Sequence, residues 1–121
     1  MILHSDVFGT AVAMSGGVDI RPFPTNWEIN QRIGTIEEAP ERWEELTVIN
    51  QARSLKPGQL AISIDCGVDD FFVGVNRALH AQLLEAKIPH DYTERPGNHS
   101  WAYWDRCIRY QMIFISEQFA R

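Results

Sequence analysis

Two kinds of hydrophobic pattern alternate along this chain, and together they predict strands separated by helices. Apolar runs at 9–14 and 59–67 and a polar segment at 90–95 predict three strands. Runs that are apolar on both alternating faces are typical of strands covered by helices on both sides. Apolar residues three and four positions apart predict helices over about 70–87 and 100–120. This order predicts an α/β fold with about three parallel strands and flanking helices.

Each of the two long helices has an apolar stripe that we expect to be buried. In the first helix the stripe consists of Phe72, Val75, Leu79, Leu83 and Ala86. In the second it consists of Trp101, Trp104, Ile108, Met112, Ile115 and Phe119. We expect Trp101 and Trp104 to anchor the last helix on the sheet, in preference to forming a pocket together with Tyr103.

The segment between the first two strands, residues 18–58, is polar and rich in proline. It predicts an irregular, partly helical excursion, with one short helix at about 27–32 that ends at Gly34. A second short helix is predicted from Pro40 to about Leu46, because proline suits the first helical position. The acidic residues of this segment are interpreted as a solvated face: Glu37, Glu38, Glu41, Glu44 and Glu45.

The composition and charge of the chain argue against several classes of protein. With 121 residues and 45% hydrophobic composition, the chain predicts one compact domain. The net charge is −5 with no basic stripe, which argues against nucleic-acid binding, and the apolar runs are too short to span a membrane. The two cysteines, Cys66 and Cys107, lack the spacing of a zinc site. Two buried free thiols are the preferred interpretation, and a disulfide stays open without geometry.

The strand at residues 9–14 is apolar on both faces, like a central strand, whereas 90–95 is polar enough for a sheet edge. No segment before residue 9 supplies a neighbour, so we expect residues 1–121 to form a single partial domain with an exposed apolar surface that favours oligomers. Residues 1–6 do not have the pattern of a signal peptide. Any signal peptide would lie upstream, and the compartment is therefore not predicted.

Two polar residues follow strands at positions suited to chemistry. Asp70 follows the second strand in Gly67-Val68-Asp69-Asp70, and His99 follows the third in Pro96-Gly97-Asn98-His99. Functional groups of open α/β sheets gather at the carboxyl ends of the strands. An acid beside a histidine fixes the tautomer and stabilises the imidazolium during proton transfer. Alone, Asp70 is more simply a helix cap and His99 a water-facing loop residue, but their paired placement favours catalysis.

Four stretches of the sequence carry a family resemblance: 6–9, 14–19, 64–71 and 88–101. They resemble the esterase D family of the α/β-hydrolase superfamily, which includes S-formylglutathione hydrolases, acetylxylan and feruloyl esterases and mycolyltransferases. The resemblance covers nearly all of the chain but only the family's C-terminal portion. It implies an α/β-hydrolase fold and serine carboxylic-ester hydrolysis. It places the triad acid at Asp70, with Asp69 as the fallback, and the triad histidine at His99.

The nucleophile is not found in this chain. In this fold the order is serine, acid, histidine, with the serine on an elbow of type Gly-x-Ser-x-Gly. In the family the elbow precedes the segment that resembles residues 6–9, so the serine and the oxyanion hole are expected before Met1. Ser15 follows a strand and precedes Gly16-Gly17, but an elbow needs a helix directly after it, and residues 18–24 contain two prolines. Two further serines are poor candidates, inside a strand and at a helix start: Ser63 and Ser100.

Two functions follow as hypotheses. In the first, the complete protein hydrolyses a small-molecule or carbohydrate ester without a cofactor, while this chain alone is inactive. In the second, the chain is a non-catalytic module that forms a homo-oligomer through its uncovered strand at 9–14. A metal site formed by Cys66, Asp70 and His99 is disfavoured, because these spacings fit no short ligand motif. The remaining histidines have no expected catalytic partner, and His80 is expected on the exposed side of its helix: His4, His80 and His90.

Overall fold

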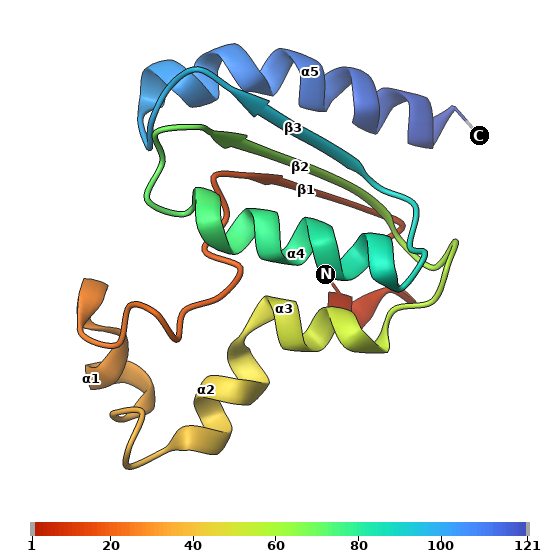
Figure 1. Cartoon of the computed structure of the whole chain (residues 1–121). Coiled ribbons are helices and arrows are strands. Elements are labelled where there is room, and N and C mark those ends of the chain that lie inside the picture. The colour runs from red at the N-terminus through yellow and green to blue at the C-terminus, as the bar shows by residue number, and fades with distance from the viewer. Residues whose placement is uncertain (1, 121) are drawn as a thin grey trace.

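A three-stranded parallel sheet with helices on both faces forms the centre of the molecule (Figure 1). The structure, a computed structural model, describes residues 2–120. Its strands are β1 (Thr10–Met14), β2 (Ala61–Gly67) and β3 (Asp91–Arg95), in the order β1-β2-β3. Both pairings are parallel. The predicted α/β fold is therefore confirmed.

The helices divide between the two faces of the sheet. Helix α5 (Trp101–Phe119) covers one face, and α4 (Val73–Glu85) and α3 (Val48–Gln51) lie on the other (Figure 1). Helices α1 (Ile29–Ile33) and α2 (Pro40–Leu46) extend from the body. Three 3-10 turns complete the elements: η1 (Ile2–His4), η2 (Asn26–Glu28) and η3 (Ala52–Ser54). Two predicted signals hold, since Pro40 opens α2 and α1 ends at Gly34, whose φ is 87°.

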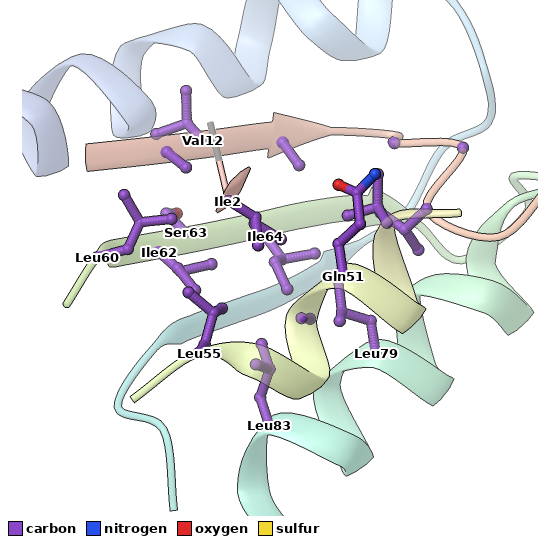
Figure 2. A pocket seen from close by; sticks show the side chains of 17 residues that line it. Ile2, Val12, Gln51, Leu55, Leu60, Ile62, Ser63, Ile64, Leu79 and Leu83 are labelled. Carbon is purple, nitrogen blue, oxygen red and sulfur yellow. The ribbon is translucent and has the colours of Figure 1, made fainter. Parts of the chain in front are cut away.

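The main core lies between the sheet and helices α3 and α4. Ile62 and Ile64 of β2 pack there with Leu79 and Leu83 of α4. Beside this core lies an open, largely apolar cavity of about 270 Å³, between β1, β2 and the two helices (Figure 2). Gln51 brings a polar side chain to the wall of this cavity.

The two edges of the sheet differ from each other. Strand β3 is an edge strand, as its polar sequence predicted. Strand β1, which has the sequence of a central strand, pairs only with β2 within residues 2–120, and all five of its residues are half-buried. One edge of an apolar strand is therefore uncovered in the described part of the chain.

The predicted burial of the two long helices is right for α4 and wrong for α5. In α4, Leu79 and Leu83 are buried as expected, although Ala86 lies beyond the helix and is exposed. In α5 the buried residues are instead Tyr103, Cys107 and Gln111. The predicted stripe is largely exposed, with Trp101 at 84% and Met112 at 56%, so Trp101 does not anchor the helix. The cause is a buried carboxylate in β2, described below, which needs hydrogen-bond donors from α5.

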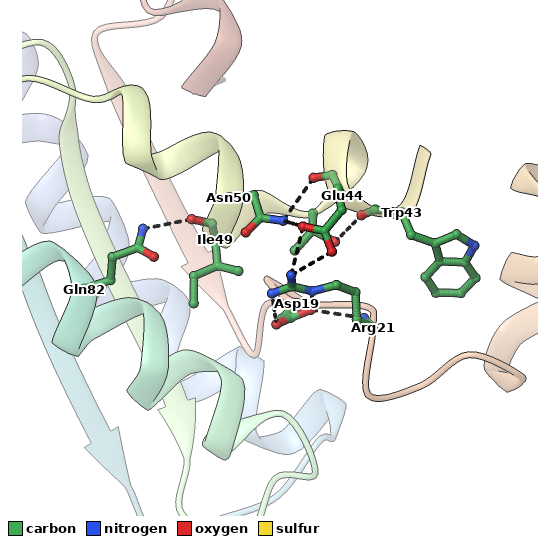
Figure 3. A network of polar contacts seen from close by, with 8 residues as sticks. Asp19, Arg21, Trp43, Glu44, Ile49, Asn50 and Gln82 are labelled. Carbon is green, nitrogen blue, oxygen red and sulfur yellow. Dashed lines mark hydrogen bonds and ion pairs between the residues drawn. The ribbon is translucent and has the colours of Figure 1, made fainter. Parts of the chain in front are cut away.

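Polar contacts tie the excursion of residues 18–58 together (Figure 3). Arg21 pairs with Asp19 at 2.8 Å and with Glu44 at 3.0 Å, and Asn50 donates to the Glu44 carboxylate at 2.6 Å. The hydrogen bond from Arg21 lowers the pKa of Asp19. Gln82 of α4 donates to the carbonyl of Ile49 at 2.8 Å, which attaches the excursion to the body of the molecule. The five glutamates of the acidic face are exposed, as predicted.

Within residues 2–120, no helix has the length and apolar character needed to cross a membrane.

Candidate active site

The site is built where β2 and β3 end side by side. Beyond the strands, Val68 N–H donates to the Arg95 carbonyl and Asp69 N–H to the Gly97 carbonyl, each at 3.0 Å. A Cβ on Gly67 would overlap the backbone of Gly97, whose carbonyl carbon would lie only 2.7 Å away. Gly97 itself has a φ of 140°, in the region that favours glycine. The two glycines thus allow the approach that brings the following loops together.

Asp70 and His99 lie within hydrogen-bond distance at this rim. Nδ1 of His99 is 3.0 Å from Oδ2 of Asp70 and 3.3 Å from Oδ1. The Asp70 side chain is fully buried, and its Oδ1 also accepts a hydrogen bond from the Phe72 N–H at 2.8 Å. The aspartate therefore closes the turn before α4 as well as contacting the histidine, but it does not cap the helix as the simpler interpretation expected, because the N-cap residue of α4 is Phe72.

The His99 ring has one occupied and one unoccupied nitrogen. When Nδ1 donates to a carboxylate, the neutral ring keeps a lone pair on Nε2. Within residues 2–120, Nε2 has no hydrogen-bond partner, and the side chain is 27% exposed. The rings of Phe71 and Trp104 pack around it, with centroids 4.4 Å and 4.8 Å from that of His99. This arrangement is able to accept a proton at Nε2 while Asp70 holds the ring in place.

Asp69, the fallback acid, does not take this position. Its side chain is exposed, and it makes no hydrogen bond to His99 in the described part of the chain. Of the two adjacent aspartates, the structure pairs Asp70 with the histidine.

Ser15 has few of the features of a nucleophile elbow. Its φ of 54° gives a strained turn, which elbows share. No helix follows it directly, however, and the residue is buried with 4% exposure. Its neighbour Gly17 is explained by packing, because a Cβ there would lie 3.1 Å from the Phe72 ring. Ser63 lies inside β2, and Ser100 caps α5 by accepting from the Tyr103 N–H.

Comparison with known proteins places the chain in a family. The sequence profile of the family described as "Putative esterase" matches residues 2–114. The chain belongs to this esterase family. The family's enzymes act on esters, in agreement with the resemblance found in the sequence.

Solved structures share the fold of this esterase chain. A ferulic acid esterase has 23% sequence identity and a TM-score of 0.74, over 98% of this chain and 45% of that one. S-formylglutathione hydrolase FrmB from Staphylococcus aureus has 20% identity and a TM-score of 0.74, over 93% and 46%. FphF, a fluorophosphonate-binding serine hydrolase of the same organism, has 21% identity and a TM-score of 0.73, over 93% and 46%. The chain therefore spans less than half the length of these proteins. A comparison with curated protein sequences finds no match.

A second carboxylate of the esterase chain was missed by sequence reasoning. Asp65, inside β2, is fully buried and pairs with the Arg95 guanidinium. It also accepts from the Tyr103 hydroxyl at 2.6 Å and lies 3.4 Å from the Cys107 thiol. The signal was present, since an aspartate inside an apolar strand needs buried partners. The sequence did not say which residues would supply them.

Both cysteines of the esterase chain are free and buried, as predicted. Burial raises the pKa of the Cys66 thiol to about 12. Cys66, Asp70 and His99 form no metal site, since residues 2–120 contain no group of three or more histidine, cysteine or acidic side chains able to hold an ion.

His80 is not on an open helix surface as expected. It is half-buried, stacks on Tyr92 with ring centroids 4.1 Å apart, and its Nδ1 lies 2.8 Å from Nε2 of His90. Burial and the neighbouring His90 lower the pKa of His80. The expectation failed because His90 and Tyr92 reach His80 only when the chain after α4 turns back to form β3.

Proposed function

We propose that Asp70 and His99 are the acid and the base of a Ser-His-Asp triad in a carboxylic-ester hydrolase. The observation that carries this proposal is the hydrogen bond between Asp70 and Nδ1 of His99, while Nε2 has no partner among residues 2–120. Membership of the esterase family supports an ester as the substrate. We propose further that the serine nucleophile lies outside residues 1–121.

In the proposed reaction Nε2 of His99 takes the proton of the serine hydroxyl as its oxygen attacks the ester carbonyl carbon. The tetrahedral intermediate collapses when His99 gives that proton to the leaving alcohol, which forms an acyl-serine. Water then attacks the acyl carbon and loses a proton to Nε2, and His99 gives this proton to the serine oxygen as the bond to the acyl carbon breaks, which releases the acid and regenerates the serine. Asp70 holds His99 in the Nδ1–H tautomer throughout.

The uncovered edge of β1 offers a place for the strand that carries the nucleophile. A further strand parallel to β1 would end at the same rim of the sheet as β2 and β3, where Asp70 and His99 lie. The oxyanion hole would come from the same part of the protein, because one of its donors is the N–H after the nucleophile. The substrate is a small-molecule or carbohydrate ester.

The tautomer of His99 tests the role of Asp70 directly. We expect ¹⁵N NMR of the folded chain near pH 8 to show the Nδ1–H form of His99, because Asp70 accepts from Nδ1. Asp70→Ala should shift the ring toward the Nε2–H form, and the control Asp69→Ala should leave it unchanged. An Nδ1–H population that is the same in all three proteins would contradict the assignment.

Labelling with a fluorophosphonate probe tests the location of the nucleophile. We expect the folded chain to remain unlabelled and to leave a short-chain chromogenic ester intact, because the activated serine lies elsewhere. Labelling that disappears in both Ser15→Ala and His99→Ala would place the nucleophile at Ser15 and overturn this part of the proposal.

A second candidate function is self-association through β1. The observation in its favour is that β1, an apolar strand, pairs on one side only within residues 2–120. Analytical ultracentrifugation of a dimer that covers this edge would give a molar mass twice that of the chain. A single monomeric species over a hundredfold range of concentration would exclude this function.

A further inference from the structure

A cluster of aromatic rings from two distant segments lies beside the proposed catalytic histidine. Phe23 and Trp27 come from the excursion, whereas Phe71 and Phe72 come from the turn before α4. The ring centroids of these four residues lie 4.6 Å to 6.5 Å apart, at the separations of attractive aromatic pairs. The excursion is thus joined to the site by aromatic contacts.

Within the cluster, Trp27, Phe71 and His99 form a row. The rings of Trp27 and Phe71 are 5.7 Å apart and tilted by 30°, and those of Phe71 and His99 are 4.4 Å apart and tilted by 35°. Trp27 is 54% exposed and Phe71 is 51% exposed, while Phe72 behind them is buried. Large aromatic rings that stay half exposed beside a reactive group are suited to contact a ligand.

The backbone that holds Trp27 in this row is strained. Trp27 and Glu28 are consecutive non-glycine residues with φ of 51° and 57°. Such conformations are unfavourable for residues with a side chain and cluster at functional sites. The Trp27 ring does not enter the main core, so that strain supports a half-exposed ring beside His99.

We propose that Trp27 and Phe71 form an aromatic platform that binds a planar, uncharged aromatic group of the ester substrate next to His99. This inference rests on the proposed function for its choice of an ester. The exposed charged residues within two positions of Trp27 and Phe71 in the sequence, Glu28 and Asp69, are both acidic, which favours a neutral ligand over an anionic one. A planar ring would stack on the exposed faces, and its ester group would then reach the rim that carries Nε2.

The test compares ligands of nearly equal size that differ in aromaticity. Methyl benzoate and methyl cyclohexanecarboxylate are titrated into the folded chain while the indole N–H of Trp27 and the His99 ring are followed by NMR. We expect methyl benzoate to bind about two- to tenfold more tightly, which corresponds to one aromatic contact. Phenyl acetate and cyclohexyl acetate, measured in the same way, distinguish an aromatic alcohol from an aromatic acyl group by the larger preference.

Variants separate the platform from other apolar surfaces. Trp27→Leu and Phe71→Leu keep apolar bulk and should abolish the aromatic preference. Phe119→Ala, which removes a ring 84% exposed near the end of α5, should retain it. Equal binding of the two probes would overturn the platform, as would ligand-induced shifts at Leu55 and Leu83 of the cavity in place of Trp27.

The outcome is distinguishable from failure of the proposed function. Trp27→Leu should leave the His99 tautomer unchanged, because Trp27 does not touch Asp70. If the wild-type chain shows no aromatic preference but has His99 in the Nδ1–H form, the platform alone is overturned. An abnormal tautomer with the preference intact would overturn the triad assignment and leave the platform as a binding site.

Discussion

Asp65 lies in β2 and Asp70 lies in the turn that follows it, five positions later, yet the hydrogen-bond partners of the two carboxylates differ in kind. Both side chains are fully buried, and both contact a nitrogen from β3 or from the loop after it. Asp65 is surrounded by an arginine, a tyrosine, a cysteine and a glutamine that together occupy its oxygens. Asp70 contacts a histidine whose second nitrogen, Nε2, has no hydrogen-bond partner in the described part of the chain.

The difference separates a carboxylate with a structural role from the one for which we propose a catalytic role. Three partners of Asp65 lie on the buried face of α5, so they fix this helix on the sheet, and the fourth partner, Arg95, comes from β3. The partner of Asp70 is 27% exposed and has one nitrogen left for another molecule. Burial of the acid alone does not distinguish the two cases, whereas the kind of partner does, because a histidine can take up and release a proton and an arginine cannot.

Asp65→Ala should break the structural side of this comparison. Removing one member of a buried ion pair leaves the other charge unpaired, which costs about 3–5 kcal/mol. We expect the free energy of unfolding in urea to fall by this amount, whereas the exposed Asp69→Ala should change it by less than about 0.5 kcal/mol. A loss below about 1 kcal/mol for Asp65→Ala would mean that Arg95 finds another partner or water.

Gly67→Ala should disturb both carboxylates at once. The added Cβ overlaps the Gly97 backbone, which cannot move aside as a flexible side chain would, so we expect a loss of about 1–3 kcal/mol. The Nδ1–H signal of His99 should weaken in the same variant. The matched control is Gly74→Ala in α4, where a Cβ meets nothing within 4 Å and should stabilise the helix by up to about 1 kcal/mol.

Asp70→Asn should be milder than any change at Asp65. The amide oxygen can still accept from the Phe72 N–H, so only the contact with His99 is lost. We expect a loss of about 1 kcal/mol in urea unfolding at pH 7, the usual net value of a hydrogen bond. A loss as large as that of Asp65→Ala would show that Asp70 is mainly structural and would weaken the catalytic assignment.

Glu94 provides the smallest effect and a control for pH. Hydrogen bonds from Arg77 and Tyr92 lower its pKa from 4.5 to about 2. Its contribution to stability is therefore complete above pH 4.5 and is lost as the pH falls toward 2. Because the Arg77 side chain is 57% exposed, Glu94→Gln should cost less than about 1 kcal/mol at pH 7 and flatten the decline between pH 4.5 and 2. If this variant loses stability between pH 4.5 and 2 as steeply as the wild type, other carboxylates cause the loss.

Local pattern was sufficient for the strands, for α2 and α4, and for the placement of Asp70 and His99. Strand ends in a parallel sheet meet at one rim whatever the details, so these two residues could be matched before the structure was known. The buried face of α5 could not be predicted, because Asp65 selects Tyr103 and Gln111 over the apolar residues of the helix. The position of Trp27 beside Phe71 could not be predicted either, because it depends on two non-glycine residues with left-handed backbone conformation.

The two buried cysteines can report on local unfolding of two different parts of the molecule. Cys66 lies in the central strand, and Cys107 lies on the buried face of α5 against Asp65. Neither is exposed, and the raised pKa of Cys66 keeps that thiol protonated at neutral pH. Alkylation of either residue must then wait for a local or global opening, because thiolates and not thiols react. Mass spectrometry of timed alkylation would compare the rates at the two cysteines. Faster alkylation of Cys107 than of Cys66 would show that the last helix leaves the sheet before the strands separate.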